Sequence, residues 1–118
     1  MINSTYTYLV IFRNELKNKS VSRYKVIGIV SELIYSKEVF KRNEDIKDFL
    51  KKVFVIEFKE YVMKSRTLIV ARVGREILKD DNSKIKKELL KFLDKKIEDI
   101  KTQDNLKNFK NDFDGWIK

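Results

Sequence analysis

The residues that could carry chemistry in this chain are almost all lysine, arginine, aspartate and glutamate. The chain contains no histidine and no cysteine, so the usual general bases, thiol nucleophiles and soft metal ligands are missing. Carboxylate sites for magnesium or calcium stay open. The close acid pairs are Asp80-Asp81, which is typical of a helix cap, and Asp112 with Asp114, near the C-terminus. We therefore expect no enzyme activity, no cofactor and no metal site.

Phosphate-binding loops and serine nucleophiles are also poorly supported. The three glycines stand at positions 28, 74 and 115, too far apart to form a glycine-rich phosphate loop. Without histidine, a serine nucleophile needs a lysine base. Ser65, between Lys64 and Arg66, is the one position that suggests such a pair. A solvated turn explains that short sequence better.

The strongest signal is positive charge. The chain holds 27 Lys and Arg against 18 Asp and Glu, a formal net charge of +9 on 118 residues. Such an excess indicates a polyanion or an acidic protein surface as the partner. The most one-sided stretch is 13–25, where Glu15 is the one acid. We predict that its bases contact phosphates, with a solvated loop as the alternative. These bases are Arg13, Lys17, Lys19, Arg23 and Lys25.

A second basic group depends on a winged helix-turn-helix interpretation. Residues 36–42 lead into a helix predicted from Glu44 to about Val53, capped by Asn43, and a β-hairpin follows. In this interpretation the helix face and the tip of the wing contact nucleic acid. The residues concerned are Lys41, Arg42, Lys47, Lys51, Lys64 and Arg66. One feature argues against it, because the acids Glu44 and Asp45 occupy the turn that recognition helices present to the groove. An ordinary packed helix with a solvated lysine face is the alternative.

The pattern of apolar residues along the chain predicts an α+β fold, in which helices cover a small antiparallel sheet. A winged helix is one fold of this kind. Residues 5–13, 54–60 and 66–73 are rich in aromatic and β-branched side chains and are predicted as strands. Gly74 is expected to end the last strand. Residues 37–42 are predicted as a short helix.

Two helical segments are predicted after the sheet. Residues 84–100 give the clearest helical stripe in the chain. It consists of Ile85, Leu89, Phe92, Leu93, Ile97 and Ile100. Residues 103–117 repeat the pattern, with Gly115 as a potential break. Phe109, Phe113 and Trp116 there predict either a cap on the core or the interface of a homodimer.

Residues 22–36 fit two structures. Their apolar residues follow helical spacing, and Ser22 stands where an N-cap belongs. The helical stripe is Val26, Ile29, Val30, Leu33 and Ile34. The β-branched pairs within the same run also fit a strand. We predict the helix, because Ser31 and Glu32 interrupt the strand pattern and complete the polar helix face.

Length and hydropathy predict one α+β domain over residues 1–118, with a helical C-terminal part from about residue 83. No segment approaches the roughly 20 apolar residues of a membrane span. The N-terminus lacks the basic start and apolar run of a signal peptide. We therefore expect a cytoplasmic protein that does not act at a membrane.

Residues 22–36 (SRYKVIGIVSELIYS) and 60–72 (EYVMKSRTLIVAR) resemble small control proteins encoded beside replication and maintenance genes on plasmids of low-GC Gram-positive bacteria. The resemblance covers about the first two thirds of the chain and implies a regulatory or nucleic-acid-binding role, without assigning individual residues. The predicted function is non-catalytic nucleic-acid binding in replication or transcription control, with DNA favoured over RNA. The alternative is a protein-binding inhibitor or adaptor of a mobile element that acts on a host protein.

Overall fold

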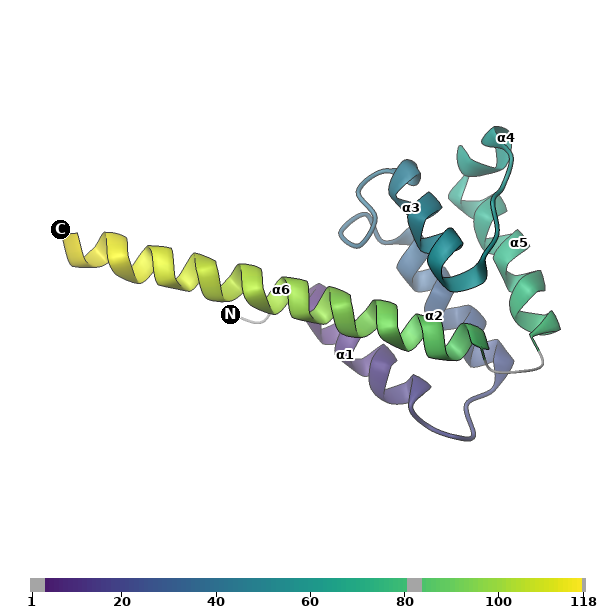
Figure 1. Cartoon of the computed structure of the whole chain (residues 1–118), viewed down its shortest axis with the longest axis horizontal. Helices are drawn as coiled ribbons and strands as arrows, with labels where there is room; N and C mark the ends of the chain where they lie inside the picture. Colours follow the sequence, from purple (N-terminus) through teal and green to yellow (C-terminus); the bar gives the residue numbers. More distant parts are fainter. Residues whose placement is uncertain (1–3, 81–83, 118) are drawn as a thin grey trace.

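The N-terminal segment with alternating apolar residues forms a helix. The structure is a computed structural model that describes the backbone of residues 4–80 and 84–117 and the side chains of 4–80 and 84–103. Ser4–Leu16 is helix α1 (Figure 1). Leu9 and Leu16 are buried, and α1 packs along α6. The predicted strand at 5–13 is wrong, because the same apolar residues also fit a period of 3.6 and packing against another helix selects that period.

Helix α2, Arg23–Tyr35, confirms the helical interpretation of residues 22–36. Ser22 is its N-cap, and its Oγ accepts a hydrogen bond of 3.1 Å from the backbone N–H of Lys25. The predicted stripe is buried in full: Val26, Ile29, Val30, Leu33 and Ile34. The helix prevails over the alternative strand because five apolar side chains at helical intervals form one continuous buried face.

A turn-containing connection replaces the short helix predicted at 37–42. Helix α3 follows at Asn43–Phe49 and continues into one π-helical turn, η1, Leu50–Phe54. Arg42, rather than Asn43, occupies the N-cap, and its backbone N–H donates to Oδ2 of Asp45 at 2.9 Å. The predicted buried stripe is confirmed: Ile46, Phe49, Leu50 and Val53.

The predicted β-hairpin does not exist in the described residues. Residues 55–59 carry no strand assignment, α4 follows at Glu60–Met63, and α5 spans Arg66–Lys79. Ser65 caps α5, because its Oγ accepts from the backbone N–H of Leu68 at 3.3 Å. Gly74 lies inside α5 and does not end it. The protein is all-helical where it is described, so the predictions of an α+β fold, a sheet and a wing are wrong.

Helix α6, Lys84–Ile117, confirms the predicted helix at 84–100 and extends it without a break at Gly115. Its 34 residues correspond to about 51 Å at 1.5 Å per residue. The first part packs on α1 and η1, while Figure 1 shows the C-terminal part extending past the other helices. The predicted core cap or dimer interface at Phe109, Phe113 and Trp116 falls on side chains outside the described residues.

One cluster of buried apolar side chains joins α1, α2, α3, η1, α4, α5 and the first part of α6. An aromatic group lies within it: Phe49 has ring centroids at 4.6 Å from Phe92, 5.1 Å from Phe40 and 5.8 Å from Phe54. Aromatic pairs in this range stabilise a core beyond their buried area. No helix within the described ranges is both long and apolar enough to cross a membrane.

Candidate nucleic-acid interface

The predicted basic stretch 13–25 is partly engaged within the protein. Arg13 points toward α6, with Nη1 3.6 Å from Oδ1 of Asp94, and its Nε is buried without a hydrogen-bond partner. Lys25 pairs with Glu15, with 3.2 Å between Nζ and Oε1. Arg23 donates from Nη1 to the carbonyl of Leu78 at 2.9 Å. These three side chains therefore help to hold helices together.

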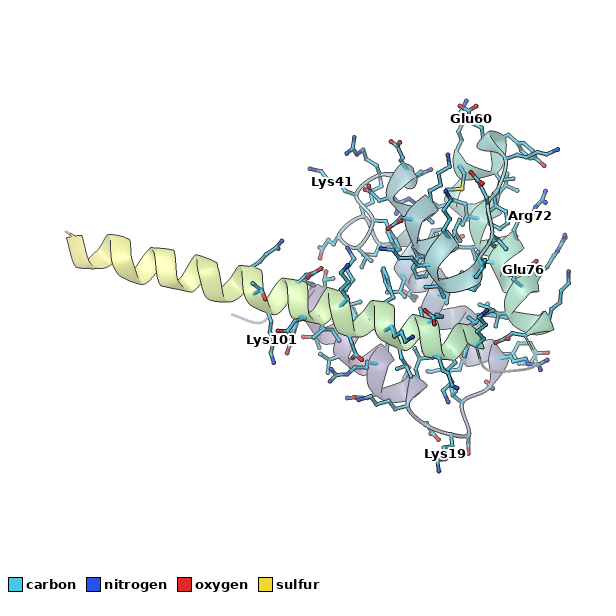
Figure 2. All side chains as sticks on the ribbon, viewed as in Figure 1. Lys19, Lys41, Glu60, Arg72, Glu76 and Lys101 are labelled. Carbon is cyan, nitrogen blue, oxygen red and sulfur yellow. The ribbon has the colours of Figure 1, made fainter. Side chains whose placement is uncertain are left out.

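Lys17 and Lys19 lie on the exposed connection between α1 and α2. The Nζ of Lys86, at the start of α6, donates to the carbonyl of Asn18 at 3.0 Å and ties this connection down. In Figure 2, Lys19 projects from this connection at the edge of the molecule. Both lysines are accessible to a partner.

Arg66 has a structural role that the sequence does not suggest. Its guanidinium donates from Nη1 to the carbonyl of Ile34 at 2.7 Å and to that of Ser36 at 3.4 Å. Nη2 donates to the carbonyl of Phe40 at 2.6 Å, and Nε donates to Oδ1 of Asn43 at 2.9 Å. These four contacts use all three nitrogens of the guanidinium group. Arg66 therefore joins α5 to the end of α2 and the start of α3 rather than facing a phosphate.

The other bases of the second predicted group are exposed. Lys41 and Arg42 precede α3, Lys47 lies on α3, Lys51 on η1, and Lys64 is the C-cap of α4. The side-chain Nδ2 of Asn43 donates to the carbonyl of Met63 at 3.0 Å. Asn43 follows Arg42 in the chain, and Met63 precedes Lys64. The hydrogen bond between Asn43 and Met63 therefore brings Arg42 and Lys64 to the same end of the protein.

The two predicted basic groups lie at opposite ends of α2. Arg23 is its first residue, whereas Arg66 binds the carbonyl of Ile34 near its last. Arg23 also contacts the last turn of α5 through Leu78. Helices α2 and α5 are therefore antiparallel, and α5 spans the distance between the two groups. Its 14 residues correspond to about 21 Å.

The outer face of α5 carries three cations that the sequence prediction missed. Leu68, Arg72, Arg75 and Lys79 are exposed and stand at i, i+4, i+7 and i+11, which places them on one stripe. Nη2 of Arg72 donates to the hydroxyl of Tyr61 at 3.1 Å. Among the described residues, no carboxylate forms an ion pair with Arg72, Arg75 or Lys79. Figure 2 shows nitrogen-tipped side chains projecting from α5 away from the other helices.

The sequence prediction missed these cations because it treated residues 66–73 as a strand. A strand over 66–73 that ends at Gly74 places Arg72 at its end and leaves Arg75 and Lys79 in a loop. The signal that finds them is the stripe of Ile69, Val73 and Ile77, which are all buried at intervals of four. Glu76 is the single acid on the helix, and it is partly buried beside this stripe.

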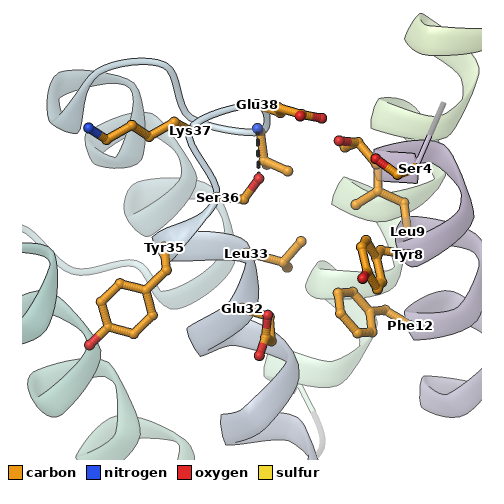
Figure 3. Close-up of a pocket in the computed structure, with 12 residues that line it drawn as sticks. Ser4, Tyr8, Leu9, Phe12, Glu32, Leu33, Tyr35, Ser36, Lys37 and Glu38 are labelled. Carbon is orange, nitrogen blue, oxygen red and sulfur yellow. Dashed lines mark hydrogen bonds between the residues drawn. The ribbon is translucent and has the colours of Figure 1, made fainter.

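Two hollows lie elsewhere on the surface. One, of about 390 Å³, lies between α1 and α2 and is lined by Tyr8, Phe12 and Glu32 (Figure 3). The other, of about 680 Å³, separates α3 and η1 from α6, and its lining includes Phe40, Phe49 and Phe92. Within the described residues, no group of three or more acidic side chains has the geometry to hold a metal ion. The first hollow is lined by aromatic and aliphatic side chains together with polar ones, and the second is lined mainly by charged side chains of both signs.

A comparison of the chain with protein-family models, with curated proteins and with solved structures finds no match.

Proposed function

We propose that this protein is a non-catalytic nucleic-acid-binding protein and that the exposed face of α5 contacts phosphates. The observation that carries the proposal is the row Arg72, Arg75 and Lys79, which is exposed and forms no ion pair with any acid in the described ranges. The resemblance to plasmid control proteins favours a regulatory role in replication or transcription, in the cytoplasm. DNA as the partner stays a prediction from the sequence.

The arrangement of charge supports this function better than net charge alone. The residues from Lys64 to Lys79 include five bases and one acid. Arg66 is engaged internally, so Arg72, Arg75 and Lys79 are left as one exposed row on α5, and Lys64 is exposed at the end of α4. A nucleic-acid strand presents one negative charge per about 3.4 Å of its length. Arg72 and Lys79 are seven residues apart on α5, which corresponds to about 10 Å and matches about three consecutive phosphates.

A salt titration tests the proposal. Four phosphate contacts predict that log K against log salt falls with a slope of about −3 to −4. Replacing Arg72, Arg75 and Lys79 together by Ala is expected to reduce that slope to about −1 and to weaken binding at every salt concentration. The measurement is fluorescence anisotropy of a labelled oligonucleotide between 50 and 200 mM salt.

The matched control removes the same charge from another surface. Lys91, Lys95 and Lys101 are exposed on α6, and replacing them by Ala also removes three positive charges. This variant is expected to keep most of the affinity. Equal losses from both triple variants would assign binding to diffuse charge and overturn the α5 interface. No binding at low salt would overturn nucleic-acid binding itself.

The alternative function, a protein-binding inhibitor or adaptor, is favoured by the groove between α3, η1 and α6. Its lining includes the partly exposed ring of Phe92, and charges of both signs surround this ring. Burial of aromatic groups between charged rims is typical of protein interfaces. Amide chemical-shift changes confined to 38–53 and 88–99 upon titration with a partner protein, with α5 unmoved, would favour this function over nucleic-acid binding.

A further inference from the structure

A row of surface residues on α2 lies beside the cationic helix. Tyr24, Gly28, Ser31 and Tyr35 stand at i, i+4, i+7 and i+11, so they share one stripe of α2. Tyr24 is 78% exposed and Tyr35 is 49% exposed. In Figure 3 the ring of Tyr35 points away from the hollow that Tyr8 and Phe12 line. The α2 row therefore ends in two exposed aromatic rings with small residues between them.

The neighbouring row on α5 also has small side chains at its centre. Thr67, Ala71, Gly74 and Leu78 follow the same spacing. A Cβ at Gly74 would lie 3.9 Å from Cγ2 of Ile27, so Gly74 lies against α2, while the other three residues are exposed. The middle positions of both rows are Gly28, Ser31, Ala71 and Gly74. These two rows, with small side chains at the centre and larger ones at the ends, form a strip along the two antiparallel helices that we call the α2–α5 channel. Arg72, Arg75 and Lys79 border this channel on the α5 side.

The fold does not explain why position 28 is a glycine. It lies in the interior of α2, where glycine destabilises a helix relative to alanine. A Cβ built at this position meets nothing within 4 Å, and its backbone conformation is not one that requires glycine. Packing within the described part of the protein therefore does not require glycine at this position. Glycine also serves where a ligand approaches the backbone closely.

From these observations we infer that the channel between α2 and α5 binds single-stranded nucleic acid, with bases stacked on Tyr24 and Tyr35 and phosphates on Arg72, Arg75 and Lys79. This inference rests on the proposed function and names its substrate class. An exposed aromatic ring can stack only on a base whose face is free, and duplex bases hide their faces within the stack. The two tyrosines, 11 residues apart along α2, are separated by about 17 Å. About five stacked nucleotides at 3.4 Å each cover that length.

Single-stranded DNA and single-stranded RNA both offer what the channel would bind, a flexible strand whose base faces are free. The test measures anisotropy with labelled 20-nucleotide single-stranded DNA, single-stranded RNA of the same sequence, and the corresponding 20-base-pair DNA duplex. We expect at least fivefold tighter binding of a single strand than of the duplex at the same salt concentration. Equal binding of the two single strands assigns recognition to bases and phosphates, and a preference for one assigns part of it to the sugar.

Substitutions at four positions sharpen the test. Tyr24→Ala and Tyr35→Ala are each expected to weaken single-strand binding by about 5- to 100-fold, and Tyr24→Phe and Tyr35→Phe to retain it, because the ring rather than the hydroxyl stacks. Tyr8→Ala, at a 60% exposed tyrosine of α1, is the matched control and is expected to have no effect. Gly28→Leu is expected to fill the channel, reduce binding and leave the melting temperature at or above that of the original protein.

The outcomes separate the two proposals. Duplex binding as tight as single-strand binding, together with unchanged affinity in both Tyr→Ala variants, would overturn the channel while leaving nucleic-acid binding by α5 intact. No binding of any of the three probes at low salt would overturn both. A single-strand preference that disappears in Tyr24→Ala, Tyr35→Ala and Gly28→Leu supports the channel.

Discussion

Nε of Arg66 donates a hydrogen bond of 2.9 Å to Oδ1 of Asn43, and this contact joins the first turn of α5 to the first turn of α3. Nδ2 of the same asparagine donates to the carbonyl of Met63 at 3.0 Å. The asparagine therefore uses both ends of its side-chain amide to hold α4 and α5 against α3. Arg66, which the sequence predicted on the tip of a DNA-binding wing, therefore holds helices together inside the protein.

Arg66→Lys is expected to destabilise the protein by about 2–4 kcal/mol, because one ammonium cannot replace a fork that binds three carbonyls and an amide oxygen. The carbonyls of Ile34 and Phe40 then lose a charged donor. Urea denaturation followed by circular dichroism measures the change. Arg75→Lys, at an exposed arginine of the same helix, is the control and should stay within about 0.5 kcal/mol. Equal effects of the two substitutions would contradict the structural role of Arg66.

Phe49→Ala is expected to cost about 3–5 kcal/mol, as is usual for deletion of a buried phenylalanine. Phe49 is 1% exposed and lies against the rings of Phe40, Phe54 and Phe92. The resulting cavity should loosen the contact between η1 and α6. Thermal denaturation measures this, with Phe49→Leu as the milder comparison. A loss below about 1 kcal/mol would show that this aromatic group is not central to the core.

Val55→Gly is expected to stabilise the protein by about 0.5–1.5 kcal/mol. Val55 ends η1 with φ 56° and ψ 41°, the left-handed conformation, which costs an L-residue about 1–2 kcal/mol and is worst for a β-branched one. The side chain is 71% exposed, so its removal sacrifices little packing. The entropy that glycine adds to the unfolded chain offsets part of the gain. A lower melting temperature for Val55→Gly would contradict strain at this position.

Gly74→Ala is expected to raise stability by about 0.5–1 kcal/mol, because alanine is the better helix former in the interior of α5. The added Cβ would lie 3.9 Å from Cγ2 of Ile27, an ordinary van der Waals contact. Gly74→Val serves as the comparison, because its branches do not fit so small a space between α2 and α5. If Gly74→Ala melts at a lower temperature than the original protein, the helices approach one another more closely than this contact indicates.

Helix α2 and the first part of α6 were predictable because helical spacing is the stronger pattern among their apolar residues. In α2 the stripe at Val26, Ile29, Val30, Leu33 and Ile34 competed with a strand pattern that Ser31 and Glu32 interrupt, and in α6 the residues Leu89, Leu93 and Ile97 recur at intervals of four. Local spacing was sufficient at these places because nearly every apolar residue lies on the face that packs. The buried stripe of α3 and η1 followed from the same reasoning.

Tertiary packing decided α1 and α5. Tyr6, Tyr8, Val10 and Phe12 alternate as a strand does, yet burial of Leu9 and Leu16 against α6 makes the segment helical. In α5 the β-branched run 69–70 and Gly74 suggested a strand and its end, while packing against α2 extends the helix to Lys79. Strand propensity measures how well side chains suit a pleated surface. No other segment here offers such a surface, so these residues packed on helices instead.

For the candidate site, too, one part was predictable from the sequence and another part depended on the tertiary structure. Composition alone determined that this protein carries an excess of positive charge and lacks histidine and cysteine. Only the tertiary structure decided which cations face outward together. Arg13, Arg23, Lys25 and Arg66 contact groups within the protein, whereas Arg72, Arg75 and Lys79 come onto one exposed row because α5 is a helix. The physical reason is that net charge is a sum over residues, while a binding surface depends on the period that places their side chains.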